Sequence, residues 1–489
     1  MYPIGKLNHA NDASHRVQSQ SSNIVLIDSL SFEVMSIIFL LSTGCSTSHG
    51  ARLDAPRRYP NDLLQVCSRW RQIALASPKL WSHIDLDLSA DSPAWNNYLL
   101  KRANMFVTRS KEVPLELHIS TKFASTIEGL TEFCKSAAPR LQSLDLETRD
   151  DLEPPFSHEP SWLVALVSGA TSGTPTRLRW KSRGGKASYL IGVDSMDMGR
   201  AHIRMTFLEQ QLEEFLSSVT TLQLENVYPF WTSRAYHGLV ELILDGDSNI
   251  RIEVKYLELE GILKASPGLQ ILRFGLKVIV EEGHVSYSRV ELNELKSLCL
   301  TSRHRASQEA VLNTVHLGKT PLELIIDATE STYSALASSC WVELYNFAAR
   351  SRITVLRIQG AEVAEFCQDT NLDPIGLLQS FPQLEVLVLD SLRFGQLAMR
   401  HFFGMGNKPI LLTPTVHDPS QFVNRLRLLR LIQCTVIWTD LRRTLEMRLA
   451  EKLVLHGCQI FAHHSEETEV KTRLRHVGPF VELNDPQPH

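Results

Sequence analysis

The chain has 489 residues, enough for about three domains of ~150 residues and a large buried core. Its 50 Lys and Arg residues nearly balance its 54 Asp and Glu residues, for a formal net charge of −4, so no overall field favours nucleic acid or an anionic membrane as a partner. Hydrophobic residues make up 43% of the chain and charged residues 21%; these shares are close to those of folded soluble proteins and exclude wholesale disorder.

The N-terminal residues 1–22 are rich in Ser, Gln, His and Asn and show no periodicity, so we expect a flexible head. They lack the basic and apolar regions of a signal peptide. The apolar stretch 24–41 is interrupted by Asp28 and Glu33, which makes a membrane span costly. We therefore expect an intracellular protein, in the cytoplasm or nucleus, that does not bind membranes.

Residues 23–89 are expected to form a small helical domain with a polar insert at 42–60. The first helix is predicted from one apolar stripe at helical spacing. Its members are Leu30, Val34, Ile37, Ile38 and Leu41. A second stripe, which Pro78 ends, consists of Leu63, Val66, Trp70, Ile73 and Ala74. A unit with this few helical residues buries little apolar surface by itself. Either a partner protein or the rest of this chain must therefore cover its apolar stripes.

The segments LSFEVMSIIF at 30–39, VCSRWRQIA at 66–74 and PKLW at 78–81 resemble an F-box, in the form abundant in mushroom-forming (basidiomycete) fungi. Ser31 stands where that family usually has Pro. The resemblance implies a docking module, because F-boxes bind a Skp-type adaptor and through it a cullin-RING ubiquitin ligase. It also implies that Trp81 lies in the internal core. The implied adaptor contacts are Leu30, Ser31, Ile38, Phe39, Val66 and Trp70.

Residues 90–110 are expected to form a linker helix. Between 111 and 480, short Leu-rich strands alternate with amphipathic helices such as 207–218. The motif Pro-x-Leu-x-x-Leu-x-Leu/Phe occurs at 139–146, 267–274 and 382–389, where chance predicts on the order of 0.1 match. A looser form starts at Val219, Leu239, Leu295, Ile353 and Leu426, and a related segment lies at 321–326.

The resulting period of about 20–30 residues is that of leucine-rich repeats. The predicted fold is therefore α/β: a small N-terminal F-box, then an irregular leucine-rich-repeat solenoid of parallel strands and helices, and a flexible tail at 481–489. Alternate strand residues, such as Leu222 and Leu224, should point into the core, because successive side chains of a strand point to opposite faces. One strand and one helix cannot close a core alone, so stacked repeats should bury a continuous core.

Such a solenoid binds a protein target through the outward residues of its strands. The candidates are Gln223, Glu241, Arg273, Lys296, Arg357, Glu385 and Arg427. Arginines between 425 and 443 form either a patch for an acidic or phosphorylated partner or an ordinary solvated surface.

We find no motif that predicts a catalytic residue, a cofactor or a metal. The eight cysteines form no CxxC pair, which argues against a zinc ribbon or a disulfide scaffold. Cys67 is expected on the buried side of its helix as a small apolar residue. His456, Cys458, His463 and His464 could gather a metal, but such residues are more often exposed to solvent.

The sequence thus favours a non-catalytic substrate-recognition subunit of a Skp–cullin–F-box ubiquitin ligase. Its partners would be the adaptor and an unidentified protein target, and no nucleic acid. Two alternatives stay open: an F-box scaffold that acts outside a ligase, and an α/β hydrolase or transferase built on a doubly wound sheet.

Overall fold

The chain divides into two compact units, Met1–Trp81 and Ser82–His489, in a computed structural model. Among the described residues, no helix combines the length and apolar character that crossing a bilayer requires. The predicted head and nearly all of the polar insert lie outside the described residues. These are 27–42, 60–89, 92–122, 127–149, 160–170, 174–183, 188–191, 202–204, 209–246, 252–280, 287–327, 339–360, 381–392, 426–438, 441–442, 450–461 and 481–484.

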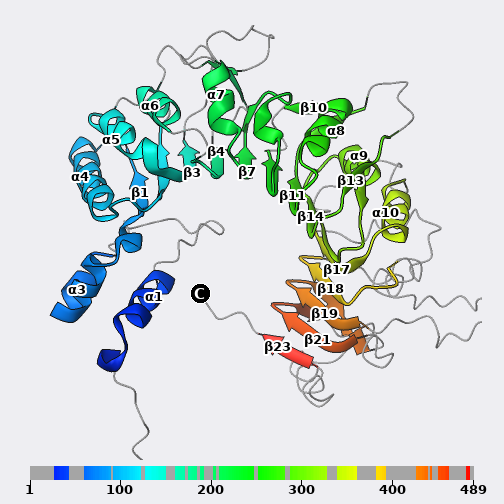
Figure 1. Ribbon diagram of the computed structural model, residues 1–489. Helices are drawn as coiled ribbons and strands as arrows, with labels where there is room; N and C mark the ends of the chain where they lie inside the picture. Colours follow the sequence, from blue (N-terminus) through cyan, green and yellow to red (C-terminus); the bar gives the residue numbers. More distant parts are fainter. Residues whose placement is uncertain are drawn as a thin grey trace, which may run out of the picture. The chain divides into compact units, whose positions relative to one another are not determined.

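The first unit is helical (Figure 1). Its elements are η1 (Ile27–Ser29), α1 (Phe32–Ser42), α2 (Leu63–Val66), α3 (Ser68–Leu75) and η2 (Pro78–Trp81). Trp81 is fully buried and its indole N–H donates to the carbonyl of Ala74 at 2.8 Å, which confirms its predicted place in the internal core. The prediction for Cys67 is wrong: it is exposed, because it precedes α3 as the N-cap and its sulfur accepts the N–H of Trp70.

Within the described residues, the second unit is built on a sheet of fourteen strands in which all neighbours are parallel. Its strands are β1 (His83–Asp87), β2 (Leu115–Thr121), β3 (Leu141–Thr148), β4 (Arg177–Ser182), β7 (Thr221–Glu225), β9 (Glu241–Asp245), β11 (Ile271–Phe274), β14 (Ser297–Leu300), β16 (Leu322–Asp327), β17 (Ile353–Gln359), β18 (Val386–Asp390), β19 (Leu426–Ile432), β21 (Ala450–His456) and β23 (Val481–Asn484). Their order in the sheet follows their order in the chain. The fold is therefore α/β and solenoid-like, and differs from a doubly wound sheet, where strand order reverses.

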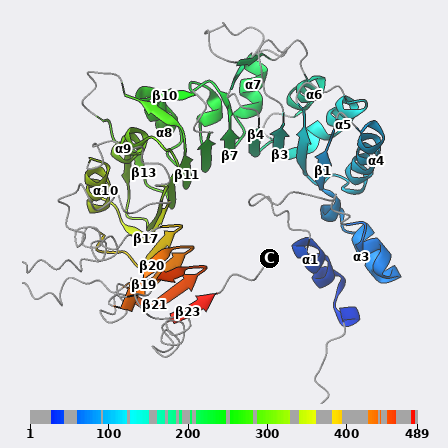
Figure 2. The same cartoon turned by 180° about the vertical axis from the view of Figure 1, so that it is seen from behind.

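The described helices of this unit lie along one face of this sheet, and no helix of the unit's described residues lies on the other face (Figure 1, Figure 2). They are α4 (Pro93–Arg109), α5 (Leu130–Ala137), α6 (Ser161–Gly169), α7 (Glu209–Leu216), α8 (Tyr256–Ala265), α9 (Arg305–Thr314) and α10 (Ser339–Ala349), with the 3-10 turns η3 (Ala138–Arg140) and η4 (Arg234–Tyr236). Outside the main sheet, short parallel strands pair with one another in small sheets. They pair β5 (Ser188–Ile191) with β6 (His202–Arg204) and β8 (Val227–Pro229), β10 (Glu253–Lys255) with β12 (Lys277–Ile279), β13 (Val290–Leu292) with β15 (Val315–Leu317), and β20 (Thr435–Ile437) with β22 (Gln459–Phe461).

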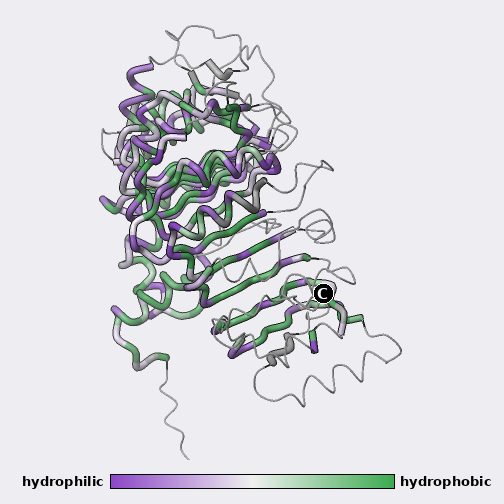
Figure 3. The backbone as a smooth tube through the Cα atoms, turned by 90° about the vertical axis from the view of Figure 1, so that its right-hand side faces the viewer, coloured by the Kyte–Doolittle hydropathy of each residue, from purple (hydrophilic) through white to green (hydrophobic). Residues whose placement is uncertain are grey.

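Two columns of buried side chains run across the sheet, because parallel strands in register place equivalent residues side by side. Figure 3 shows the hydrophobic stretches along the strands. Every described member is at most 7% exposed. The first column is Ile84, Leu117, Leu144, Leu178, Leu222, Leu242, Leu272, Leu298, Leu324, Leu356, Leu387, Leu429 and Leu453. The second lies two residues further along each strand and includes Leu224. The inward positions predicted from the sequence are confirmed.

All the motifs at 139–146, 267–274, 321–326 and 382–389, and the looser copies, lie on or lead into strands of this sheet, as predicted. The predicted helix at 207–218 contains α7.

The domain limits in the structure differ from the predicted ones. β1, expected in the first domain, pairs with β2, and the expected linker helix is α4, which packs on β1. The tail prediction is wrong for 481–484, since β23 pairs with β21.

Candidate interaction surfaces

Helix α1 has two apolar sides, of which only one is covered. Met35 and Phe39 are buried, and the Phe39 ring lies 4.9 Å from the ring of Trp70 on α3. The other side carries large apolar side chains that remain in contact with solvent. We call Val34, Ile37, Ile38 and Leu41 the α1 stripe; their exposed fractions run from 39% for Ile38 to 78% for Leu41. This stripe is nearly the one that the sequence predicted as the apolar side of the helix.

The six predicted adaptor contacts therefore differ in their exposure to solvent. Ile38 is exposed, as is Val66 at the end of α2. Ser31 is also exposed and accepts the N–H of Val34 at the start of α1, at 3.4 Å. Leu30 and Trp70 are half-buried, and Phe39 belongs to the contact between α1 and α3. The family pattern did not mark Ile37 and Leu41, although their periodicity did.

The face of the sheet without helices is the second candidate surface, which we call the open face. Its residues alternate with the two buried columns and are mostly half-exposed. Of the predicted target contacts, Gln223, Glu241, Arg273 and Arg357 lie on it. Gln223 donates to the Glu241 carboxylate at 2.6 Å, so the structure brings those two together.

The remaining predicted contacts lie at the entries of their strands. Lys296 and Glu385 immediately precede β14 and β18, and Arg427 is the second residue of β19; all three are exposed. Lys296 donates to the side chain of Gln270 at 2.9 Å. These side chains are distributed over several strands, so they border the open face and form no single cluster.

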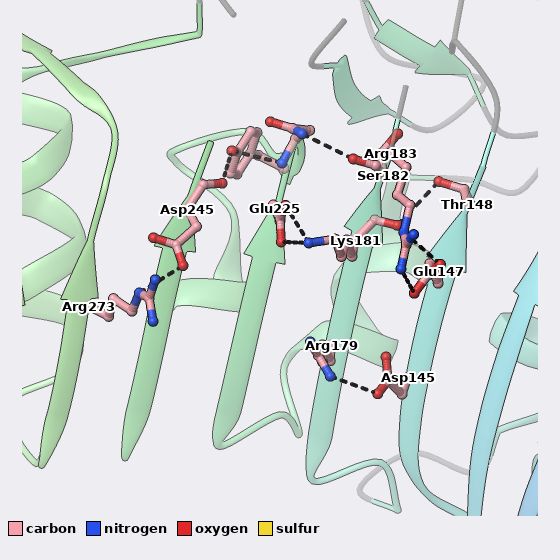
Figure 4. Close-up of polar contacts among 12 residues, drawn as sticks. Asp145, Glu147, Thr148, Arg179, Lys181, Ser182, Arg183, Glu225, Asp245 and Arg273 are labelled. Carbon is pink, nitrogen blue, oxygen red and sulfur yellow. Dashed lines mark hydrogen bonds and ion pairs between the residues drawn. The ribbon is translucent and has the colours of Figure 1, made fainter. Parts of the chain in front are cut away.

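Ion pairs cross the open face between neighbouring strands (Figure 4). The pairs are Arg179 with Asp145 at 3.2 Å, Lys181 with Glu225 at 2.6 Å, Arg183 with Glu147 at 2.8 Å and Arg273 with Asp245 at 2.8 Å. Arg357 pairs likewise with Asp390. Half-exposed pairs of this kind add little stability. Their effect is to neutralise charge, so the central part of the open face presents mixed polar groups to a partner.

A His–Asp cluster lies where the sheet begins. Asp85 Oδ1 is 3.0 Å from His83 Nε2 and 3.3 Å from His118 Nδ1, and His83 Nδ1 is 3.3 Å from a carboxylate oxygen of Glu116. Burial alone would raise the pKa of Asp85, but its hydrogen bonds to His118 and His83 hold that pKa well below its usual range. Burial also opposes the charged form of His118, yet the hydrogen bond to Asp85 raises the pKa of His118. No local sequence pattern indicates this cluster, because only strand register makes Asp85 and His118 neighbours.

Aliphatic side chains gather on the open face toward the C-terminal strands. Val355, Val386 and Leu428 are direct neighbours on β17, β18 and β19, and Val388 lies beside Arg357. All four aliphatic side chains are half-exposed. Arg430, next to Val388 in register, is exposed. The open face therefore carries an aliphatic patch bordered by arginine.

The predicted metal set is only partly described. His463 and His464 lie outside the described residues, and no group of three or more His, Cys, Asp or Glu side chains within the described ranges is placed to hold a metal ion. The Cys458 thiol instead donates to the carbonyl of Leu431 at 3.3 Å.

Comparison with known proteins assigns no family. The chain matches no protein-family model, and no curated protein matches its sequence.

Proposed function

We propose that this chain is the substrate-recognition subunit of a Skp–cullin–F-box ubiquitin ligase. In this proposal the first unit is an F-box that docks on a Skp-type adaptor, and the second is a leucine-rich-repeat solenoid that holds a protein target. The observation that carries the proposal is the α1 stripe together with Val66, since large apolar side chains exposed on a small unit are typical of a surface that another protein covers.

The arrangement of α1 supports docking through the stripe. Met35 and Phe39 already satisfy the internal packing of the unit. Covering Ile37, Ile38 and Leu41 would remove apolar surface from water, and a fully buried side chain of this size contributes about 1.5–3 kcal/mol. Aliphatic and aromatic anchors at the centre of an interface usually carry most of its affinity.

The second unit would hold the target by the open face, with the aliphatic patch of Val355, Val386 and Leu428 contacting apolar side chains of the target. The chain itself would then perform no bond-making step. Its contribution would be proximity: holding the target near the ubiquitin-loaded enzyme raises the effective concentration of the target lysine.

Adaptor binding by full-length variants tests the docking proposal. We expect the wild-type chain to retain a purified Skp-type adaptor with about micromolar affinity or better, and Ile37→Ser and Leu41→Ser each to weaken binding at least about tenfold. Leu257→Ser is the matched control, because Leu257 on α8 is 56% exposed, as is Ile37. Equal adaptor affinity in Ile37→Ser, Leu41→Ser and Leu257→Ser, or no adaptor binding by the wild-type chain, would contradict the proposal.

Trp70→Ala is expected to weaken the complex by about 2 kcal/mol or more. Because the Trp70 ring also packs on Phe39, the stability of the variant must be measured alongside its affinity.

An F-box scaffold outside a ligase would use the same α1 stripe. The two functions differ in one readout: only a ligase subunit increases ubiquitin transfer to a bound target when adaptor, cullin and ubiquitin-loaded enzyme are supplied.

A further inference from the structure

Two cysteines occupy equivalent positions in neighbouring turns of the sheet. Cys434 follows β19 and Cys458 follows β21. The strands are in register on both sides of them, with Ile432 opposite His456 before the cysteines and Thr435 opposite Gln459 after them. The two backbones are also joined directly, since the N–H of Gln459 donates to the carbonyl of Cys434 at 2.9 Å. Neighbouring strands lie about 4.8 Å apart, which is within the ~4.4–6.8 Å between Cα atoms that a disulfide spans.

The two thiols, at adjacent positions in the register, differ in environment. Cys434 is buried, whereas Cys458 is half-exposed. The Cys434 thiol donates to the carbonyl of Leu389 at 3.2 Å, and the Cys458 thiol donates to the carbonyl of Leu431 at 3.3 Å. The neighbouring Cys434 thiol lowers the pKa of Cys458 to about 7. The neighbouring Cys458 and burial raise the pKa of Cys434. By contrast, burial raises the pKa of Cys299 to about 11, and it raises that of Cys134 too. A half-exposed thiolate beside a second, protected thiol is the arrangement of a reacting and a resolving cysteine.

We propose that Cys434 and Cys458 form a reversible disulfide when the protein meets a hydroperoxide, and that this bond joins neighbouring turns of the sheet. The Cys458 thiolate attacks the peroxide, forming an S–O bond as the O–O bond breaks and hydroxide leaves. The Cys434 sulfur then attacks the sulfenic sulfur, forming the S–S bond as the S–O bond breaks. The departing hydroxide takes the Cys434 proton. With hydrogen peroxide, two thiols are oxidised, one peroxide is reduced and two waters are produced, and an external dithiol reverses the change.

The consequence would be a covalent tie between β19 and β21. The open face in that part carries Leu428, Arg430 and Lys452, so oxidation would fix the spacing of the strands that border the aliphatic patch. This inference does not depend on the proposed ligase function.

Peptide mapping of the full-length folded protein tests the disulfide. Trypsin cuts after Arg430, Arg442, Lys452 and Lys471, which separates Cys434 in peptide 431–442 from Cys458 in peptide 453–471. After treatment with dilute hydrogen peroxide and blocking of free thiols, we expect these two peptides linked, at a mass lower by the two hydrogens lost, and separated again by a dithiol. Alkylation near pH 7 before oxidation should modify Cys458 faster than Cys299.

Matched variants separate a specific bond from general oxidation. Cys434→Ser should leave a sulfenic acid at Cys458 that dimedone traps, while Cys67→Ser, which removes an exposed thiol elsewhere, should leave the linked peptides unchanged. The proposal is overturned if the folded wild-type protein yields no linked peptides while Cys458 is oxidised, or if Cys458 links mainly to another cysteine. The wild-type result decides the matter even if a variant fails to fold.

Discussion

Tyr228 offers a sharp test of how neighbouring turns of the second unit are held together. Its side chain is fully buried; the hydroxyl donates to the carbonyl of Asp245 and accepts the N–H of Asn226 at 2.9 Å. The side-chain amide of Asn226 donates to the carbonyl of Ser182 at 3.0 Å. Tyr228→Phe keeps the ring and opens no sizeable cavity, but it leaves the buried N–H of Asn226 and the carbonyl of half-buried Asp245 without this partner. At about 1–3 kcal/mol for each unpaired buried group, we expect a loss of about 2–4 kcal/mol in the free energy of unfolding.

Urea unfolding followed by circular dichroism measures this loss, and hydrogen exchange should locate it, with faster exchange across β7, β8 and β9 than elsewhere. Tyr98→Phe is the control. Tyr98 is 53% exposed on α4 and stacks on Trp95 at 5.3 Å between ring centroids, so its change should stay within about 0.5 kcal/mol. If Tyr228→Phe falls within the same range as the control, the hydroxyl does not hold the turns together and the reasoning fails.

Three further predictions concern single side chains. Arg140→Ala should cost about 2–3 kcal/mol in urea unfolding, because its guanidinium donates to carbonyls at the end of α4 and the turn after it, at 2.6–3.2 Å; full recovery in Arg140→Lys would contradict this. Because the pKa of His118 is raised in the folded state, its pairing with Asp85 stabilises the fold below about pH 6.5 and the benefit is lost as pH rises through the folded-state pKa. Asp85→Asn should therefore destabilise more near pH ~6 than near pH ~9, and an equal loss at both would refute the pairing. Gly275→Ala places a Cβ 2.7 Å from Thr301 Oγ1 and should cost about 1–3 kcal/mol by overpacking; an unchanged urea midpoint would show that the site can expand.

Much of the strand pattern could be predicted from the sequence, because strand formation here depends on local alternation. The motif at 139–146 alone marks three apolar positions, and all three, Leu141, Leu144 and Leu146, are buried residues of β3. Other strands carry no such motif, and the reason is physical. β1 offers only Ile84 and Leu86 as alternating apolar residues, and so short a pattern is common by chance. Its place in the sheet comes from pairing with β2.

The residues of the candidate docking surface could be predicted from the sequence, but their exposure to solvent could not. Helix α1 has apolar residues on nearly every side, so periodicity found the α1 stripe but could not tell whether it would be covered. Packing against α3 decided this, because the Phe39 ring meets Trp70 while Leu41 remains in solvent. The exposed position of Cys67 was decided in the same way, by the break between α2 and α3.

The amino-acid sequence by itself determined where many of the strands form and that they repeat, since both depend on apolar residues at short, fixed spacing. Only the tertiary structure decided which distant residues meet. Register between parallel strands placed Asp85 beside His118 and Cys434 beside Cys458. No local pattern encodes these neighbours, because the lengths of the connecting segments vary from turn to turn and the alignment of strands follows from the buried columns of the whole sheet.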